Sequence, residues 1–404
     1  MFNLFRTAAV AAVLLAPAPA VLLGAEFAGE LTLDPAGVTR INSAVTVSMA
    51  GGVPEGNLIL LPGISGGPAT PVQVERTPAG ATLRFVVHKL DGERPRTFAV
   101  FRDDPPAVPP AAWRFADGGG HRDLLFGDAP VSRDMIAYDP ARIEETFKPF
   151  THVYGFGRDP ALITKGPGGR YTHHRGIFFG FNDTPHGDFW HGKGVSQRHA
   201  RYLAEREFAG PVAARRAQVV DWVGRDEKAV IRDTREVITW RVGPAHVVMD
   251  YEVTVAALTD EPITLGGDAH HAGFHFRAAQ EVADAPGADG KPGAAVYTRP
   301  AGATRVKDDV WEACDWTHAA FSVDGKPYAV THLDPPANPR PNQYSTRPYG
   351  RFGSFFKGEV SKDKPLRLRY RLIIRDGSAP VPPEQLAAEY TDFITPVTAN
   401  FKKQ

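Results

Sequence analysis

Short stretches in which apolar and polar residues alternate recur along the whole chain and predict β-strands. The alternation is clearest over residues 366–372, where Leu and Tyr alternate with Arg, and over residues 247–255, whose apolar set is Val247, Met249, Tyr251, Val253 and Val255. Successive side chains of a strand point to opposite faces, so each stretch is predicted to have one buried and one solvated face. Residues 228–241 predict a longer bent strand or a strand pair.

The pattern divides the chain into two β units and a tail. Within residues 28–110, five apolar runs alternate with Gly/Pro turns and predict a small β-sandwich: 44–49, 57–61, 72–75, 81–87 and 97–101. A Pro-rich linker at residues 103–110 marks its end. The larger β unit then covers residues 111–377. In the tail, 378–404, apolar residues at helical spacing predict one amphipathic helix over 384–394.

Composition agrees with this division. The chain has 404 residues, 40 of them Gly and 36 Pro, which indicates many turns and few long helices. We therefore predict an all-β fold: a small N-terminal β-sandwich, a larger β-supersandwich and a short C-terminal helix. Cys314 is the only cysteine, so neither an intramolecular disulfide nor a cysteine metal site is expected.

Charge and the N-terminal segment limit the partners and the compartment. The 46 Lys and Arg balance 46 Asp and Glu, so net charge gives no reason to expect nucleic acid as a partner. Residues 1–25 contain an apolar run after Arg6 and end in small residues, which is typical of a secretory signal peptide. We expect a periplasmic or secreted protein without an integral membrane span after cleavage.

Three segments of the larger unit carry the candidate chemistry, and we expect them to share a polar pocket. The first holds His173, His174 and Arg175 before an aromatic strand, with Trp190 nearby as a stacking face. The second and third segments supply the remaining candidates: His270, His271, His275, Arg277, Asp334, Asn338, Arg347 and Tyr349. Imidazole and guanidinium groups beside an aromatic ring suit a polyol or a carboxylate.

Other kinds of site have less support. Neutral imidazoles bind metals, but the histidines lack the spacing and the matched carboxylate of a metal motif, so we expect no cofactor. A serine nucleophile would need a G-x-S-x-G turn, and a phosphate loop would need Lys-Ser/Thr after its glycines; neither pattern occurs.

The same segments resemble the DUF6807 family, often labelled methane oxygenase PmoA-like, over residues 114–377. The matching motifs are Thr172-His-His-Arg-Gly176, Asp188-Phe-Trp190, His271-Ala-Gly-Phe-His-Phe-Arg277, Asp315-Trp316, Asp334-Pro-Pro-Ala-Asn-Pro339 and Arg347-Pro-Tyr-Gly350. The chain departs from the family pattern at residues 170–172 and 342–346. The oxygenase label implies a helical membrane protein, which this sequence does not support.

The larger unit is also distantly similar to the aldose 1-epimerase (galactose mutarotase) supersandwich. That likeness implies that His174 orients a sugar, that His270 or His271 is the general acid, and that Asp334 is the base. The chain offers Asp334 where that family uses Glu.

These observations favour an exported protein that binds or acts on a small or oligomeric carbohydrate by His/Asp acid–base chemistry. As an enzyme it would be a carbohydrate-active isomerase, lyase or hydrolase. One alternative is a non-catalytic glycan-binding or surface-assembly module, with Trp190 and Trp316 as stacking platforms. Another is a periplasmic metalloprotein that holds its metal through histidine.

Overall fold

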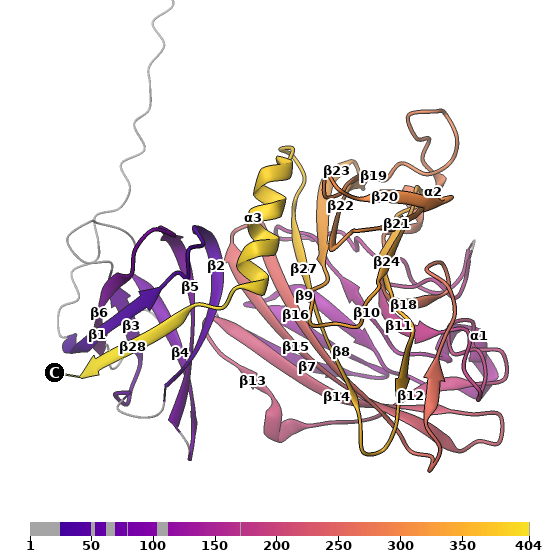
Figure 1. The fold of residues 1–404 in the computed structure, drawn as a ribbon, viewed down its shortest axis with the longest axis horizontal. Helices are drawn as coiled ribbons and strands as arrows, with labels where there is room; N and C mark the ends of the chain where they lie inside the picture. The colour runs from indigo at the N-terminus through magenta and orange to yellow at the C-terminus, as the bar shows by residue number, and fades with distance from the viewer. Residues whose placement is uncertain are drawn as a thin grey trace, which may run out of the picture.

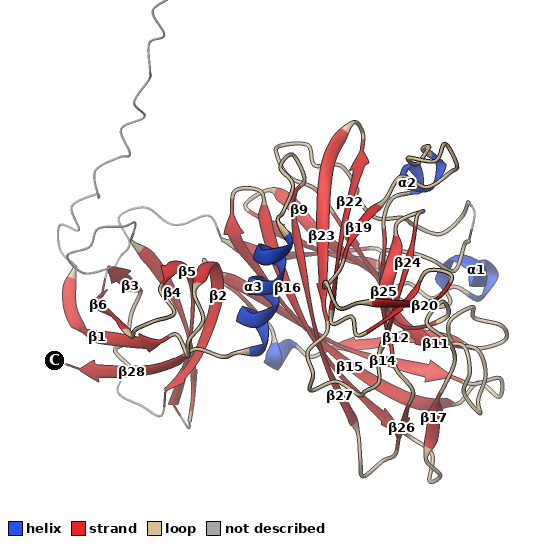
Figure 2. Cartoon of the chain, turned by 45° about the horizontal axis from the view of Figure 1, so that its top comes forward, coloured by secondary structure: helices blue, strands red, loops and turns tan. Residues whose placement is uncertain are grey.

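The computed structural model describes residues 25–49, 53–61, 69–78, 80–102, 112–169 and 171–403, and these residues form mostly β-strands (Figures 1 and 2). The all-β prediction is confirmed. The expected signal peptide, except for Ala25, and the linker at 103–110 lie outside the described residues.

Seven strands form the N-terminal sheet, and all five strands predicted there are present. In sheet order they are β2 (Arg40–Met49), β5 (Gly80–Leu90), β4 (Thr70–Thr77), β3 (Leu58–Leu61), β6 (Arg96–Arg102), β1 (Glu26–Asp34) and β28 (Thr398–Lys403). Its own hydrophobic core contains Leu31, Leu33, Phe85 and Leu90, none of which is exposed.

The larger unit consists of two main antiparallel sheets. The ten-stranded sheet has the order β20 (Thr304–Lys307), β21 (Val310–Glu312), β24 (Gln343–Arg347), β25 (Arg351–Phe355), β18 (Ala272–Arg277), β11 (Ile177–Phe181), β10 (Phe150–Val153), β9 (Ala129–Met135), β8 (His121–Phe126) and β7 (Trp113–Gly118). The nine-stranded sheet has the order β12 (Ser196–Tyr202), β14 (Ala213–Val223), β15 (Ala229–Gly243), β16 (His246–Ala257), β27 (Leu366–Asp376), β23 (Lys326–Leu333), β22 (Trp316–Val323) and β19 (Val296–Thr298), with β13 (Phe208–Ala209) paired to β14.

The remaining regular elements are short, apart from one helix. Strands β17 (Ile263–Leu265) and β26 (Gly358–Val360) form a separate pair. Helices α1 (Ile143–Thr146) and α2 (Gln280–Asp284) are single turns, whereas α3 (Pro383–Ile394) has twelve residues.

The main hydrophobic core fills the space between the two large sheets. Phe274 of the ten-stranded sheet stacks on Tyr370 of the nine-stranded sheet, with ring centroids 4.5 Å apart and an interplanar angle of 5°. Phe276, also on β18, is fully buried in the same core. Alternate residues of β18 therefore point into this core, and the residues between them point away from it.

The predicted alternation holds on β16 and only partly on β27. All five apolar residues of β16 are buried, and Arg367 and Arg369 of β27 are exposed as expected. Arg371 was predicted to be solvated but is buried, because α3 and the N-terminal unit cover this end of the sheet. Its charge is matched by Asp250, which accepts two hydrogen bonds of 2.6 and 2.9 Å. Residues 228–241 form one long strand, β15.

The tail connects the two units. The predicted helix is confirmed as α3, and it buries Leu386 and Phe393 in a cluster with Trp240, Trp316 and Ile373 of the nine-stranded sheet. The chain then returns to the N-terminal unit, where β28 pairs with β1 (Figure 1). The sequence analysis did not predict this last strand.

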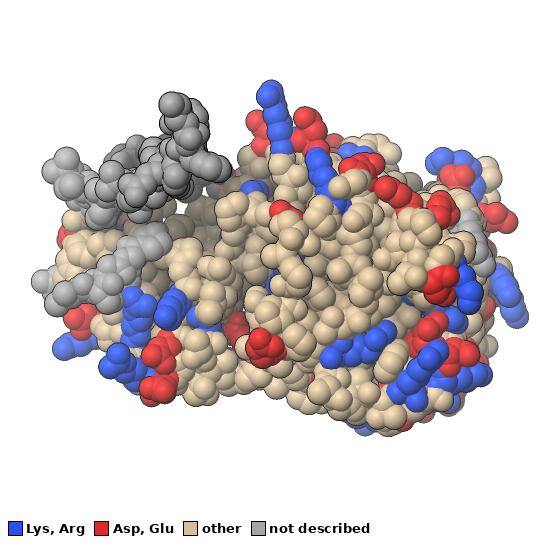
Figure 3. Space-filling view, turned by 90° about the horizontal axis from the view of Figure 1, so that it is seen from above, with Lys and Arg blue, Asp and Glu red and all other residues tan. Residues whose placement is uncertain are grey.

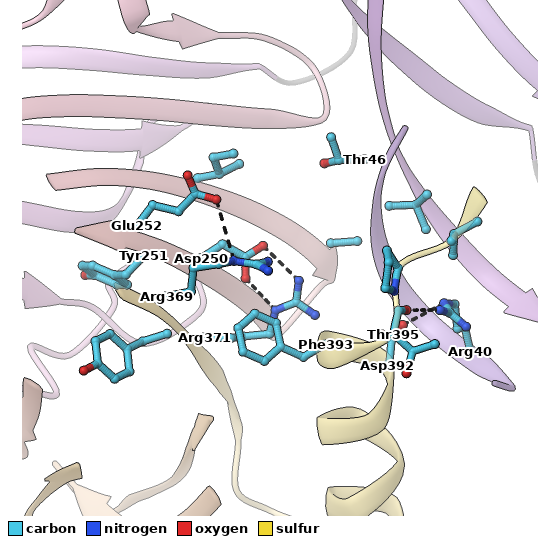
Figure 4. A pocket seen from close by; sticks show the side chains of 16 residues that line it. Arg40, Thr46, Asp250, Tyr251, Glu252, Arg369, Arg371, Asp392, Phe393 and Thr395 are labelled. Carbon is cyan, nitrogen blue, oxygen red and sulfur yellow. Dashed lines mark hydrogen bonds and ion pairs between the residues drawn. The ribbon is translucent and has the colours of Figure 1, made fainter. Parts of the chain in front are cut away.

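A cavity of about 250 Å³ lies at the junction of the two units and α3 (Figure 4). Arg40 of β2 and Asp392 of α3 form an ion pair of 2.8 Å, while Arg369 lies 3.8 Å from Glu252. With the Arg371–Asp250 pair, every charged side chain that lines this cavity has an oppositely charged partner. Of these three pairs, Arg40–Asp392 connects the N-terminal unit to α3, whereas the other two join β16 to β27 within the nine-stranded sheet. We infer that the Arg40–Asp392 pair fastens the N-terminal unit to the tail.

Replacing Asp392 with Asn should destabilise the protein, because Arg40 is 1% exposed and would lose its only carboxylate. We expect a cost of about 1–3 kcal/mol in the free energy of unfolding, measured by urea denaturation. Glu252→Gln in the same cavity is the matched control and should cost less than about 1 kcal/mol, because that pair is solvated. Equal effects of the two substitutions would contradict this reading of the junction.

Buried histidines should make the fold acid-sensitive. Burial lowers the pKa of His332 to about 3 and that of His152 to about 4, from 6.5. Between those values and pH 6.5 the unfolded chain binds more protons, so stability is lost as pH falls through this window. Each group contributes a slope of up to about 1.4 kcal/mol per pH unit. Urea denaturation from pH 7.5 to 4.5 should show the decline in the free energy of unfolding, and His332→Gln should make this decline less steep. Parallel profiles would count against His332 as a source.

Candidate functional site

The candidate residues gather on the face of the ten-stranded sheet that points away from the main core. On β18, His275 and Arg277 alternate with Phe274 and Phe276, and they are completely buried by the chain segments that cover this face. His275 pairs with Phe178 on one side and with Gly353 on the other. A Cβ atom at Gly353 would lie 2.7 Å from Cγ of His275, so the missing side chain leaves room for the imidazole.

A small aromatic core supports this face. Phe150, Phe178 and Trp190 pack together, and Trp190 lies 4.9 Å from His275 between ring centroids. Trp190 is fully buried and therefore cannot serve as the open stacking face that the sequence suggested. Lys148 lies over the Phe178 and Trp190 rings and donates a hydrogen bond of 2.8 Å to the carbonyl oxygen of Trp190.

Five imidazoles follow one another, beginning at the buried His174, and we call them the histidine row: His174, His173, His191, His271 and His270. The distances between successive ring centroids are 4.1, 4.5, 5.2 and 6.0 Å. The row joins the first two predicted segments, as expected. His191 completes it, although the sequence analysis did not rank it among the site residues.

Two members of the row are held by aspartates in the same local motif, Asp-x-x-His. Asp188 Oδ2 lies 2.7 Å from Nδ1 of His191, and its Oδ1 accepts the backbone N–H groups of Trp190 and His191. Asp268 makes the same kinds of contact. Its Oδ2 lies 3.2 Å from Nδ1 of His271, and its Oδ1 accepts the backbone N–H of His270 at 2.8 Å. A carboxylate at Nδ1 favours the tautomer whose proton is on Nδ1, which leaves Nε2 as the acceptor.

The electrostatics keep both aspartates ionised. The hydrogen bond with His271 lowers the pKa of Asp268 to about 2. Burial alone would raise the pKa of Asp188, but the hydrogen bonds from His191 prevail and lower it. Both carboxylates can therefore stabilise a protonated imidazole.

The other members of the row are neutral at physiological pH. Burial is the main cause, and nearby Lys148 adds to it, so that the pKa of His173 falls to about 2. Burial is also the main cause for His270, whose pKa falls to about 4, and the positive charges of Arg347 and Arg351 lower it further. His174 is 3% exposed, and neither of its ring nitrogens has a hydrogen-bond partner within the described part of the chain.

A pocket of about 430 Å³ adjoins the row. Its lining is Tyr171, Arg277, Ala283, Asp284, Pro292, Asp309, Arg347, Pro348 and Tyr349. Tyr349 stacks on His174 at 5.9 Å, and Tyr171 lies 5.2 Å from Tyr349, so the two tyrosines connect the pocket with the inner end of the row. The predicted residues Arg277, Arg347 and Tyr349 therefore belong to the same site as the histidines.

Arg175 has an anchoring role. Its guanidinium donates to the carbonyl oxygens of Glu145 and Glu144 in α1, at 2.6 and 2.8 Å, and to that of Thr172 at 3.0 Å. These bonds fix the His-His-Arg-Gly turn against the chain before β10.

The structure does not bring Asp334, Asn338 and Trp316 to this site. Asp334 is 1% exposed and is held by Asn338 Nδ2 at 2.7 Å and Asn342 Nδ2 at 3.0 Å. It adjoins a buried polar cluster with Tyr344 on the core side of the ten-stranded sheet, so this sheet separates it from the histidine row. Trp316 is buried in a cluster with residues of α3 and therefore cannot serve as an open stacking platform. The structure therefore places these three residues away from the histidines, contrary to the shared pocket expected from the sequence.

Several residues of the site were not selected from the sequence: Lys148, Lys165, Tyr171, Asp188, Asp268 and Arg351. The repeated Asp-x-x-His motif, Asp188 to His191 and Asp268 to His271, was a readable signal for the two aspartates. Nothing local in the sequence marks Lys148 or Arg351, since only the packing of distant strands brings them here.

Two properties of the described residues bear on the alternatives. These residues contain no group of three or more His, Cys, Asp or Glu arranged to hold a metal ion. Over the same residues, no helix has the length and apolar character needed to cross a membrane.

Comparison with models of known protein families gave a match. The model of a family of unknown function, DUF6807, matches residues 123–391, which include the nine-stranded sheet, the ten-stranded sheet apart from β7 and the start of β8, and most of α3. The resemblance seen in the sequence is thereby confirmed at the level of the family. The match carries neither the oxygenase label nor the epimerase likeness. No curated protein matched the chain.

Arg347→Gln should raise the pKa of His270 from about 4 towards 6.5, because Arg347 is the largest charge-based cause of its depression. An NMR titration of the imidazole resonances between pH 3.5 and 7.5 measures it. Arg232→Gln, which removes an arginine paired with Asp221 on the nine-stranded sheet, should leave the titration unchanged. An unaltered His270 titration in Arg347→Gln would contradict the electrostatic coupling of pocket and row.

Proposed function

The chain belongs to the DUF6807 family, whose function is unknown, and we propose that it is an exported protein that binds a carbohydrate, a sugar or a sugar acid, at the histidine row and acts on it by acid–base chemistry. The pocket beside the row accommodates one or two sugar rings by volume. Tyr171 and Tyr349 offer ring faces, and imidazoles offer hydrogen-bond donors and acceptors for hydroxyl groups.

One observation carries this proposal: two Asp-supported imidazoles, His191 and His271, lie 5.2 Å apart between ring centroids at the accessible end of the row. Reactions at a sugar hydroxyl or ring oxygen need one group to accept a proton and another to donate one. In each pair, Nε2 exchanges the proton with the sugar while the aspartate at Nδ1 stabilises the imidazolium, as in other His–Asp pairs. Isomerase, lyase and hydrolase reactions all use such a pair.

This arrangement changes the assignment of roles. His271 keeps its role as an acid–base group, His191 becomes its partner, and His174 contacts the ligand from the interior as a neutral hydrogen-bonding group. Asp334 has no part, because it lies across the sheet and is already bonded to Asn338 and Asn342. Asp188 and Asp268 supply the carboxylates for the acid–base chemistry, a role that the sequence had suggested for Asp334.

A non-catalytic glycan-binding role is the second candidate. The stacked contact of Tyr349 with His174, and the 38% exposed Tyr171 beside it, favour it, since aromatic faces bind sugar rings without any proton transfer. In that case the histidines would contribute hydrogen bonds only.

The test combines binding and turnover. The purified protein is screened by thermal shift against sugars and sugar acids, and any stabilising ligand is incubated with it and followed by NMR. We expect His191→Gln and His271→Gln to lower the rate about 10²–10⁴-fold while binding persists. His88→Gln, on the exposed surface of the N-terminal sheet, is the matched control. Binding without turnover by the wild type would favour the glycan-binding role, and undiminished turnover in both variants would overturn the acid–base assignment.

A further inference from the structure

Buried cations of this protein fall into two classes. Eleven Arg and Lys residues are buried within the described ranges. Six have a carboxylate within 4 Å: Arg40, Arg84, Arg216, Arg235, Arg371 and Arg375. The other five pair with no carboxylate of the described chain, and we call them the cation cluster: Lys148, Lys165, Arg175, Arg277 and Arg351. All six paired cations lie elsewhere, whereas all five unpaired ones lie at the candidate site.

Neutral groups accept most of the hydrogen bonds of the cation cluster but do not balance its charge. Lys165 donates to the carbonyl oxygens of Gly166 at 3.0 Å and Gly168 at 2.5 Å. Arg277 donates to the carbonyl oxygens of Ala278, at 2.8 Å, and Tyr349. Arg351 contacts Nδ1 of His275 at 3.1 Å and donates to Ser345 Oγ at 3.0 Å. A buried cation without a counter-charge is costly for a fold, and burial accordingly lowers the pKa of Lys148 well below its usual range and that of Lys165 to about 8. Five such side chains at one place require a reason.

The cation cluster lies beside His174. Lys165 Nζ donates to the carbonyl oxygen of His174 at 3.3 Å, and Arg277 lies over the ring of Tyr349, which stacks on His174. After burial, the positive charges of Arg351, Lys148 and Arg277 also lower the pKa of His174. His174 itself is buried with both ring nitrogens unpartnered, and Nε of Arg277 also lacks a partner among the described residues. Polar atoms left open beside excess positive charge indicate a place for an acceptor that carries negative charge.

Figure 3 shows Lys and Arg interspersed with Asp and Glu on one face of the molecule, without a large area of one sign there. That face gives no separate indication of a charged ligand.

We propose that the ligand of this site is a sugar acid whose carboxylate is bound at the Arg277 side of the pocket and offsets part of the positive charge of the cation cluster. This deepens the proposed function and rests on it. A carboxylate matches the planar donor array of a guanidinium. A singly charged group is favoured over a dianion, because Asp284 and Asp309 also line the pocket. The sugar ring then extends past Tyr349 towards His191 and His271.

Matched ligand pairs test the charge requirement directly. Isothermal titration calorimetry and thermal shift would compare glucuronate with glucose and glucuronamide, galacturonate with galactose, and gluconate with glucitol; inorganic phosphate and sulfate are measured separately. We expect at least one acid to bind tenfold or more tighter than its neutral counterparts. The amide keeps the shape of the acid without the charge, so it isolates the electrostatic contribution.

Variants then locate the carboxylate. Arg277→Gln should abolish the preference for the acid over the amide, and Arg277→Lys, which keeps the charge, should retain a weakened preference. Arg114→Gln, an exposed position paired with Asp128, is the control and should behave as the wild type. Circular dichroism and thermal melting show that each variant folds. If Arg277→Gln does not fold, the comparison of Arg277→Lys with the wild type, together with the acid–amide pairs, still decides.

The outcomes separate this inference from the proposed function. Neutral sugars that bind as tightly as their acids would overturn the requirement for an anion and leave a sugar site standing. Binding of phosphate or sulfate alone would overturn the sugar acid and indicate an inorganic anion site. If no sugar of either kind binds, both proposals fail. A preference for the acid that survives unchanged in Arg277→Gln would overturn the placement at Arg277.

Discussion

The two-residue period of strand β18 is the constraint on which both the core and the candidate site depend. Phe274 and Phe276 point into the space between the large sheets, so His275 and Arg277 must point to the opposite face. A shift of one residue would place an imidazole and a guanidinium in the main core and turn two phenylalanines to the polar face. The burial of the aromatic residues thus fixes the direction of the polar ones.

The polar face is itself closed by chain segments, and this closure gives the site its unusual electrostatics. Trp190 and the His-His-Arg-Gly turn cover His275, which removes water from the neighbouring cations. Elsewhere in the protein such cations are paired, as Arg216 is with Asp134 at 2.6 Å. A protein that leaves five cations unpaired at one place gives up stability there, and this is typical of binding and catalytic sites rather than of structural networks.

The two β units are coupled through the C-terminal tail. Helix α3 packs on the nine-stranded sheet, and β28 extends the N-terminal sheet beside β1 (Figures 1 and 2). The Arg40–Asp392 pair beside the junction cavity adds a specific contact to this covalent connection (Figure 4). Because the last strand of the N-terminal sheet is made from the end of the chain, that sheet is complete only when the tail has crossed the larger unit.

The sequence by itself determined the all-β class, five of the seven strands of the N-terminal sheet, the long strands β15, β16 and β27, helix α3 and the family, because these follow from local periodicity and from motifs that are contiguous in the chain. It also identified the histidines of two segments as candidate site residues. Tertiary structure alone decided which faces they share. Asp334 and His271 both stand near strand ends, yet the pairing of the strands places them on opposite sides of one sheet. Lys148 and Arg351 meet around His174 only through contacts between residues far apart in the sequence, and no local pattern encodes such a meeting. Strand β28 is the same case: its residues, Thr398–Lys403, are too polar to predict a strand, and pairing with β1 supplies what their own pattern lacks.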